Sequence, residues 1–356
     1  MPGAIVTGSG GLVGAESVRR LVAAGYDVVG IENDMRARFF GPEASTSHVT
    51  ESLDEAYPEL RSLDADVRDT GAIARAFRHV SDLELVIHAA AQPSHDWAAR
   101  EPHTDFGINA IGTLNLLEAT RQHAPDATFV LMSTNKVYGD LPNSLPLLDL
   151  ETRLDLPPDH PYFDGIDTTM SIDRSTHSLF GVSKTAADLL TQEYGRYFHM
   201  PTCCFRCGCI TGPIHAGAEL HGFLAYLMKA TVTATPYTVY GYEGKQVRDN
   251  ISGADLADAC LAFHRSPRPG AVYNMGGGRA GSCSMLEAIE LCEDIAGREL
   301  DWTLSGRARI GDHRWWISDL RPFQADYPDW ELTNDVASLL REIHDHNVDR
   351  WSAAPA

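Results

Sequence analysis

A glycine-rich segment near the start of the chain has the residue types and spacing of a phosphate-binding turn. Thr7–Gly14 reads Thr-Gly-Ser-Gly-Gly-Leu-Val-Gly, directly after an apolar run and directly before residues with helical spacing. Glycine allows a tight turn and a close backbone approach, and the free amides at the start of a helix attract a pyrophosphate. The segment therefore predicts a dinucleotide site formed by Gly8, Gly11, Leu12 and Val13; a purely structural glycine turn is the alternative.

An acidic residue follows at the position expected for ribose recognition. Glu32 lies twenty-four residues after Gly8, at the end of a second apolar run, where its carboxylate can accept hydrogen bonds from ribose hydroxyls. This favours NAD over NADP. Arg36 is interpreted as an adenine-stacking residue, although an arginine there can also meet a 2′-phosphate. Asp66 and Val67 are expected at the adenine, with a solvated turn as the alternative.

The elements that position these residues alternate between strand and helix patterns. Apolar runs over 4–7, 26–31, 85–90, 128–133 and 202–207 indicate strands, and helical spacing occurs over 12–24, 112–123 and 183–197. The alternation predicts an α/β fold: a Rossmann-type doubly wound parallel sheet with a smaller C-terminal substrate-binding lobe. We expect residues 1–206 with approximately 245–275 to form the NAD-binding domain, and approximately 207–244 and 276–350 to form the lobe. The Asp- and Pro-rich stretch 150–169 predicts a long functional loop.

The composition disfavours several classes of partner. The 356 residues carry a formal net charge of −20. Such an acidic chain has no broad attraction for nucleic acid or for an anionic membrane surface. No apolar run is long enough to predict a spanning helix and no signal-peptide pattern opens the sequence, so a cytoplasmic location is expected. Four of the seven cysteines lie within 203–209, in a strand-like run that favours buried thiols over a zinc or redox site.

Several motifs together resemble the extended short-chain dehydrogenase/reductases. They are the glycine spacing, His88-Ala89-Ala90-Ala91, Asn109 with Gly112-Thr113, and Tyr138-Gly139. Two longer strings, Ser133–Asp140 and Gly244–Asp249, are similar to the CDP-paratose (CDP-tyvelose) 2-epimerases of the NAD-dependent epimerase/dehydratase branch. The correspondence runs across most of the chain. It implies NAD as cofactor, a nucleoside diphosphate sugar as ligand, and a homo-oligomer.

The resemblance also assigns further residues to the site. It implies a cofactor site that adds Asn33, Ala89, Ala90, Ala91, Asn109, Ser133 and Lys184. It implies a substrate site formed by Gln92, Thr134, Asn135, Lys136, His177, Cys207, Tyr240, Arg248 and Arg314. In the related 4,6-dehydratases Asp-Glu usually stands where this chain has Asn135-Lys136, which argues against that activity.

Structural alternatives stay open for several of these residues. Lys136 could form a surface salt bridge, Arg248 and Arg314 could pair with Asp249 or Asp312, and Tyr240 and Tyr242 could simply cover the lobe. His215, Glu219 and His221 have spacings that could hold a metal, but the resemblance supplies none. Trp315-Trp316 is expected to pack inside the lobe rather than to bind sugar.

The resemblance implies a mechanism in which NAD takes hydride from sugar C2 and returns it to the opposite face of a transient ketone. Thr134 matches the residue whose hydroxyl bonds the reacting oxygen, and Lys184 matches the lysine that binds the nicotinamide ribose. The tyrosine of the family's Tyr-x-x-x-Lys pair is absent, because Phe180 stands at that position. A phenyl ring cannot accept the hydroxyl proton, and losing such a base costs about 10²–10⁴ in rate.

Phe180 leaves two explanations open: a substitution made to trap substrate, or natural divergence. Cys207 and Met132, which also depart from the pattern of the epimerases, favour divergence. His177, Cys207 or a water held by Thr134 would then be the proton acceptor. We predict NAD-dependent C2 epimerisation of a nucleoside diphosphate sugar, slowed by Phe180. A nucleotide-sugar or nucleotide dehydratase and a non-catalytic NAD and nucleotide-sugar binding protein are the alternatives.

Overall fold

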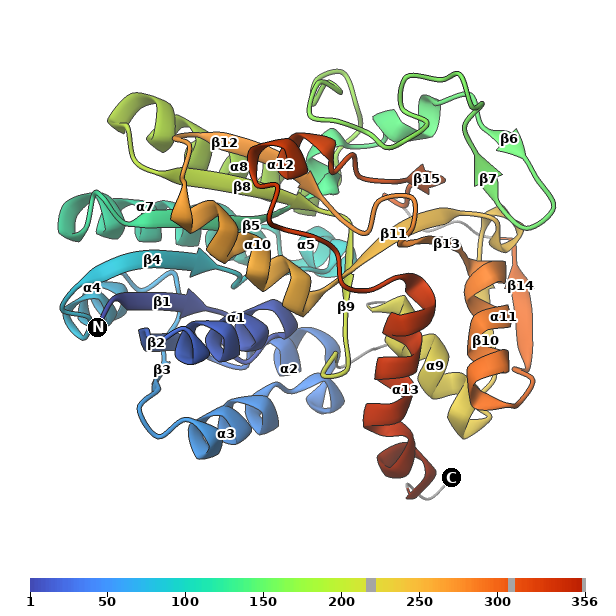
Figure 1. The fold of residues 1–356 in the computed structure, drawn as a ribbon, viewed down its shortest axis with the longest axis horizontal. Coiled ribbons are helices and arrows are strands. Elements are labelled where there is room, and N and C mark those ends of the chain that lie inside the picture. The colour runs from blue at the N-terminus through green and yellow to red at the C-terminus, as the bar shows by residue number, and fades with distance from the viewer. Residues whose placement is uncertain (216–221, 307–310, 354–356) are drawn as a thin grey trace.

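A seven-stranded parallel sheet forms the centre of the protein in a computed structural model that describes residues 1–215, 222–306 and 311–353. The strand order is β12-β8-β5-β4-β1-β2-β3 (Figure 1). The order reverses between β1 and β4, as it does in doubly wound sheets, where ligands bind at the carboxyl ends of the strands. The strands are β1 (Gly3–Thr7), β2 (Asp27–Glu32), β3 (Arg61–Asp64), β4 (Leu83–His88), β5 (Thr128–Thr134), β8 (Thr202–Cys207) and β12 (Ala271–Met275).

Helices cover both faces of the sheet, because the side chains of each strand alternate between the faces. Along β8, Cys203 and Phe205 join the apolar cluster of one face and Cys204 joins that of the other. The first face packs against α1 (Leu12–Ala23), α3 (Ser47–Ala56), α10 (Gly253–Arg265) and α12 (Arg321–Asp326). The second packs against α2 (Met35–Phe40), α4 (Thr70–Arg78), α7 (Gly112–His123) and α8 (Leu179–Phe198). The predicted doubly wound α/β fold is confirmed.

Most predicted elements lie within a few residues of their expected ends. The helix expected from Ser183 begins at Leu179 instead, because the Ser178 hydroxyl accepts a hydrogen bond from the Gly181 amide at 3.1 Å and caps the first turn. Phe180 therefore lies inside α8. Short helical segments complete the body: η1 (Pro42–Ala44), α5 (His95–Arg100), α6 (Pro102–Phe106), the π-helical turn η2 (Gly107–Ile111), η3 (Asn135–Tyr138) and η4 (Leu141–Ser144).

A smaller group of elements lies beside the carboxyl ends of the strands (Figure 1). Its apolar cluster joins α9 (Phe223–Thr233), α11 (Met285–Ala296) and α13 (Val336–Ala353) with the parallel pair β10 (Tyr237–Tyr240) and β14 (Trp302–Ser305). The short η5 (Tyr242–Gly244) follows β10. A second sheet places β11 (Val247–Ser252) beside β9 (Cys209–Thr211), β13 (Ser282–Ser284) and β15 (Trp315–Trp316). The domain boundaries expected from the sequence remain a prediction.

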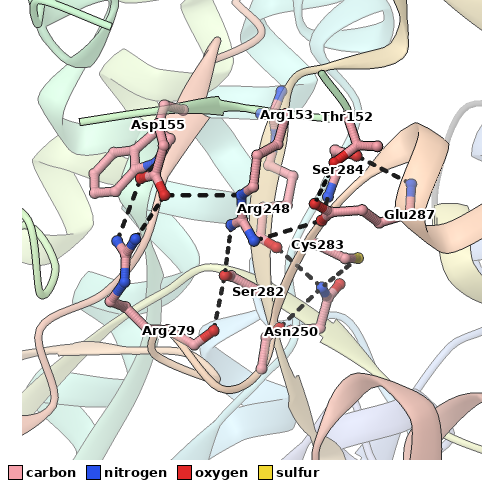
Figure 2. A network of polar contacts seen from close by, with 12 residues as sticks. Thr152, Arg153, Asp155, Arg248, Asn250, Arg279, Ser282, Cys283, Ser284 and Glu287 are labelled. Atoms are coloured by element: carbon pink, nitrogen blue, oxygen red, sulfur yellow. Dashed lines mark hydrogen bonds and ion pairs between the residues drawn. The ribbon is translucent and has the colours of Figure 1, made fainter. Parts of the chain in front are cut away.

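The expected loop over 150–169 contains no helix and carries one strand of a short hairpin. That strand, β7 (Leu154–Asp155), pairs with β6 (Leu148–Asp149). Figure 2 shows how Arg153 fastens the hairpin: it donates to the Ser282 hydroxyl at 2.9 Å and lies 3.5 Å from the Glu287 carboxylate. Because Ser282 is on β13 and Glu287 is on α11, the hairpin is joined to both elements, and β13 in turn pairs with β11.

Two packing predictions are confirmed. Cys203, Cys204 and Cys207 are buried free thiols in β8, whereas Cys209 is a half-buried free thiol in β9, and the Trp315-Trp316 side chains have no exposed surface. In the part of the chain that the structure describes, no helix combines the length and the apolar character needed to cross a membrane.

A buried ion pair joins α8 to β8. The Asp188 carboxylate accepts hydrogen bonds from Arg206 Nε at 3.1 Å and Nη2 at 2.7 Å, and from the Ser133 hydroxyl of β5 at 2.6 Å. Arg206 also donates to the Tyr138 hydroxyl at 3.0 Å. Removing one partner would leave an uncompensated charge in the interior.

Asp188→Ala is therefore expected to lower the free energy of unfolding by about 3–5 kcal/mol, measured from urea unfolding curves. Asp164→Ala is the matched control, because it removes a carboxylate from an exposed pair with Arg321 and should cost less than about 1 kcal/mol. Equal losses in the two variants would contradict a special role for the buried pair.

Candidate active site

A cavity of about 750 Å³ lies at the carboxyl ends of the strands, between the sheet and the smaller lobe. Its volume is in the range of cofactor and substrate sites. It brings together residues that are spread over most of the sequence. The predicted site residues that line it are Gly8, Gly11, Leu12, Val13, Glu32, Asn33, Arg36, Asp66, Val67, Ala89, Ala90, Ala91, Ser133, Thr134, Asn135, Lys136, Phe180, Lys184, Cys207, Tyr240 and Arg248.

Four predicted residues lie outside this lining: Gln92, Asn109, His177 and Arg314. The buried Asn109 side chain accepts from the Gln92 amide at 2.9 Å and donates to the Ser183 hydroxyl at 3.0 Å, so it ties the loop after β4 to α8. The ring of His177 lies 2.7 Å from the Val137 carbonyl. The Arg314 amide donates to Asn143, and its guanidinium lies 5.9 Å from the Tyr242 ring. Direct ligand contact by these four residues remains a prediction.

The glycine turn leaves open space where side chains would intrude. Gly8 has φ +68°, and a Cβ there would lie 2.8 Å from the Ala90 nitrogen. A Cβ on Gly14 would lie 2.0 Å from the Gly8 carbonyl oxygen. Gly11 is the N-cap of α1, and no side chain caps the free amides of the first turn. These amides are therefore available to an anion at the end of the helix.

The Glu32 carboxylate is fixed by backbone amides beside this turn. It accepts from Gly10 at 3.1 Å and from Asn33 and Asp34 at 2.9 Å each. Arg36 lies 5.1 Å from the Phe40 ring on the same side of the cavity. The Asp66 carboxylate is held by Arg68 at 2.6 Å. These contacts orient the predicted ribose and adenine residues without any ligand.

Two reactive side chains emerge from β5 and α8. Lys184 donates to the Met132 carbonyl at 2.7 Å, and burial lowers its pKa to about 8. Thr134 is the last residue of β5, and its hydroxyl accepts a hydrogen bond from the Lys136 amide at 3.3 Å. Phe180 lies one helical turn before Lys184 and is 7% exposed, with its ring in the cavity wall.

A second group of charges lies where the substrate is expected. The Lys136 ammonium donates to the Gly311 carbonyl at 2.9 Å, and burial lowers its pKa to about 8. Lys136 is thus half-buried in the cavity wall and does not form the surface salt bridge considered above. Arg248 lies 3.7 Å from the Asp312 carboxylate, so the pairing alternative for this residue is present in the structure. Both partners line the cavity, where an anionic ligand can compete with Asp312.

His95 was not predicted from the sequence, yet it lines the cavity, and its ring lies 4.9 Å from that of Phe180. A weak signal was available, since His95 follows closely on the carboxyl end of a predicted parallel strand. Two proposed proton acceptors fit poorly: His177 is outside the lining, and burial raises the pKa of Cys207 to about 12. No group of three metal-ligating side chains occurs among the described residues, which do not include Glu219 or His221.

Residues 4–276, more than half of the chain, match the model of the NAD dependent epimerase/dehydratase family. The chain belongs to this family. The resemblance inferred from the motifs is therefore confirmed, and with it NAD as the cofactor of the family.

Members of the family resemble this chain over most of its length. A CDP-paratose 2-epimerase from Salmonella typhi is 29% identical over 353 residues, which are 96% of this chain and 98% of that protein. A dTDP-glucose 4,6-dehydratase from Salmonella typhimurium is 27% identical over 281 residues, covering 77% and 71%. The structure of a Thermus thermophilus UDP-glucose 4-epimerase in complex with NAD has a TM-score of 0.76 at 23% identity, with 100% of both chains covered. This last likeness shows the shared fold.

The site of this family member fits NAD on its own geometry. The side-chain-free turn and the open amides of α1 suit a pyrophosphate, and the oriented Glu32 carboxylate suits ribose hydroxyls. Lys184 lines the same cavity, as do Thr134 and Phe180. The cavity therefore has one end that suits the adenosine part of the cofactor and another end that carries the reactive side chains.

Lys184→Met should remove turnover without destabilising the fold. Because burial lowers the pKa of Lys184 from 10.5 to about 8, the unfolded chain binds more protons between these pH values. The buried charge therefore costs the folded state about 3 kcal/mol below pH 8, and this cost vanishes as the pH rises to 10.5. The free energy of unfolding of the variant, measured with urea at neutral pH, should equal or exceed that of the unmodified chain.

The advantage of Lys184→Met should shrink as the pH approaches 10. Lys245→Met is the control, since the Lys245 ammonium pairs with Asp149 near the surface and should change stability by less than about 1 kcal/mol. A large loss of stability in Lys184→Met at neutral pH would show that the buried ammonium stabilises the fold.

Proposed function

We propose that this protein epimerises a nucleoside diphosphate sugar at C2. When bound, NAD would accept hydride from the sugar carbon and return it to the other face. The observation that carries the proposal is that a dinucleotide cradle, the Thr134-Lys184 pair and the Lys136-Arg248 cations share one cavity. The relative that spans nearly the whole chain, a CDP-paratose 2-epimerase, supports the choice of reaction.

Thr134 and Lys184 would orient the reacting groups. The Thr134 hydroxyl accepts one backbone hydrogen bond and donates to Asn135 Oδ1 at 3.5 Å, a long contact that the sugar oxygen that becomes a carbonyl would replace. The Lys184 ammonium would bind ribose hydroxyls of the cofactor, and its charge would favour an anionic oxygen nearby. Both groups are held by backbone contacts, so little reorganisation is needed when the ligands enter.

Lys136 and Arg248 would bind the diphosphate. A guanidinium presents a planar fork of donors that suits phosphate oxygens, and a half-buried ammonium adds a point charge. Arg248 is held in place by β11, whose neighbour β13 is fastened by the Arg153 hairpin (Figure 2). A ligand phosphate would replace Asp312 as the partner of Arg248.

Phe180→Tyr should reveal the reaction, because it supplies the phenol whose absence costs about 10²–10⁴ in rate. With a panel of nucleotide sugars, transient absorbance of reduced NAD should be followed by a product of unchanged mass. Nuclear magnetic resonance should assign the inverted centre to C2, and deuterium placed at C2 should stay on the sugar. If this variant forms neither reduced NAD nor product with any nucleotide sugar, the proposal is contradicted.

The same experiment separates two other activities. A dehydratase is favoured by several relatives with that name, and its product would have lost water. Asn135 and Lys136 provide no carboxyl group for such an elimination. A non-catalytic binding protein is favoured by Phe180, and it would bind NAD and nucleotide sugar tightly in both forms without moving hydrogen.

We further propose that two copies of the chain associate through α8 and the adjoining α6. Leu179, Val182 and Leu189 are exposed apolar residues of α8, and their spacing of three and seven places them on one helix face. Phe106 of α6, which packs beside α8, is also exposed. An apolar surface of this kind on two neighbouring helices suits a twofold contact with an identical surface.

Val182→Glu should convert a dimer or larger assembly into a monomer, since the charge would be buried in the contact. The molar mass in solution is measured by light scattering after size-exclusion chromatography. Leu304→Glu on β14 is the matched control, because Leu304 is 53% exposed and Val182 is 45% exposed. A monomeric unmodified chain, or an unchanged mass in Val182→Glu, would contradict this interface.

A further inference from the structure

His95 occupies the place in the cavity where a proton acceptor is missing. It is the first residue of α5, which begins after the Ser94 cap, and its ring meets that of Phe180 edge to face, with centroids 4.9 Å apart and planes at 63°. It lines the same cavity as Thr134 and Lys184. The imidazole is therefore the titratable ring in direct contact with the side chain that replaces the usual phenol.

The second ring nitrogen ties His95 to the catalytic helix. His95 Nδ1 lies 2.8 Å from the Ser178 hydroxyl, which also caps α8 by accepting from Gly181. A hydroxyl oxygen has two lone pairs, so Ser178 can accept from both the Gly181 amide and an Nδ1–H group. Within residues 1–215, 222–306 and 311–353, no hydrogen bond engages Nε2. With Nδ1 protonated, Nε2 keeps a lone pair available for a ligand.

Burial and a nearby cation keep the imidazole of His95 neutral. Burial and then the Lys136 ammonium lower its pKa to about 4, whereas Asp312 and Asp96 act in the opposite direction. Burial, Lys136 and Arg248 also lower the pKa of the buried His313, so that this ring is neutral as well. A neutral imidazole can accept a proton, and an imidazolium cannot; the same low pKa makes this imidazole a weaker base than an exposed histidine.

We propose that His95 Nε2 accepts the hydroxyl proton of the sugar in place of a tyrosine, an inference that rests on the proposed epimerisation. In the first half-reaction the O–H bond breaks and an Nε2–H bond forms, while the C2–H electron pair and its hydrogen pass to NAD. A ketone and an imidazolium result. In the second half-reaction hydride returns to the opposite face of C2 and the proton returns to the oxygen. Neutral His95 and oxidised cofactor are regenerated, so no other reactant is needed.

The contact also explains how Phe180 can be tolerated. The ring fills the cavity wall and presents an edge-to-face surface that holds the imidazole. The Ser178 contact fixes the ring orientation from the opposite nitrogen, as an orienting group does for a catalytic histidine. Phe180 is then a positioning residue for His95.

The test is a two-by-two comparison of His95→Asn and Phe180→Tyr, each followed by product formation with nucleotide sugars. Asparagine retains a polar group near Ser178 but cannot accept the proton at neutral pH. In the chain as given, His95→Asn should lower kcat by about 10²–10⁴ with KM little changed. In the Phe180→Tyr background the same change should cost less than about tenfold, because the phenol takes the proton.

Two further measurements separate a proton transfer from structural damage. Added imidazole should restore part of kcat to His95→Ala, since it can fill the space left by the side chain, and should not stimulate the unmodified chain. His123→Ala is the control, because His123 is exposed at the end of α7 and away from the cavity. NAD binding by each variant is measured by calorimetry and should be unchanged.

The outcomes distinguish this inference from the proposed function. If Phe180→Tyr turns over and the unmodified chain does not, the role of His95 is overturned, whereas the proposed epimerisation is retained. Equal losses from His95→Asn in both backgrounds would assign His95 to substrate binding instead. Inactivity of both proteins toward every nucleotide sugar would overturn both proposals.

Discussion

The buried pair between Asp188 and Arg206 is the constraint on which the reactive end of the cavity depends. Asp188 lies one helical turn after Lys184 on α8, and it also accepts from Ser133, the neighbour of Thr134 on β5. Arg206 continues the network to Tyr138, and Tyr138 donates to Asn274 on β12 at 2.8 Å. The strands β5, β8 and β12, the helix α8 and the short η3 thereby share one set of hydrogen bonds. The distance between a hydroxyl on β5 and an ammonium on α8 is set by this network, in which Ser133 is the one member that lines the cavity.

The cavity is less acidic than the molecule as a whole. The chain has a formal net charge of −20, whereas the cavity lining combines the cations Lys184, Lys136, Arg36 and Arg248 with the carboxylates of Glu32, Asp66, Asp96 and Asp312. Burial lowers the pKa of the two lysines, and an anionic ligand would raise it again by supplying a counter-charge. We therefore expect the cavity to favour a doubly anionic ligand over a neutral sugar, which supplies no counter-charge.

The sequence was sufficient for the fold and for the adenosine end of the site, because both depend on local patterns. Glycine spacing, a strand before it and an acidic residue after it lie within about thirty positions of the chain. The start of α8 was misplaced because the Ser178 cap is a single hydrogen bond with no periodic signature. His95 was missed for a different reason. Its importance arises only when α5 packs on α8, which joins segments more than eighty residues apart.

The placement of β12 has a consequence for biosynthesis. β8 ends at residue 207, and its outer neighbour β12 starts at residue 271, after β9, β10 and β11 of the other sheets. At roughly 5–20 residues per second of translation, several seconds pass before β12 is made. During that interval β8, with its apolar Cys-Cys-Phe run, is an open edge of the sheet. A chain that ends between these strands would leave β8 as an unpaired edge able to pair with other chains.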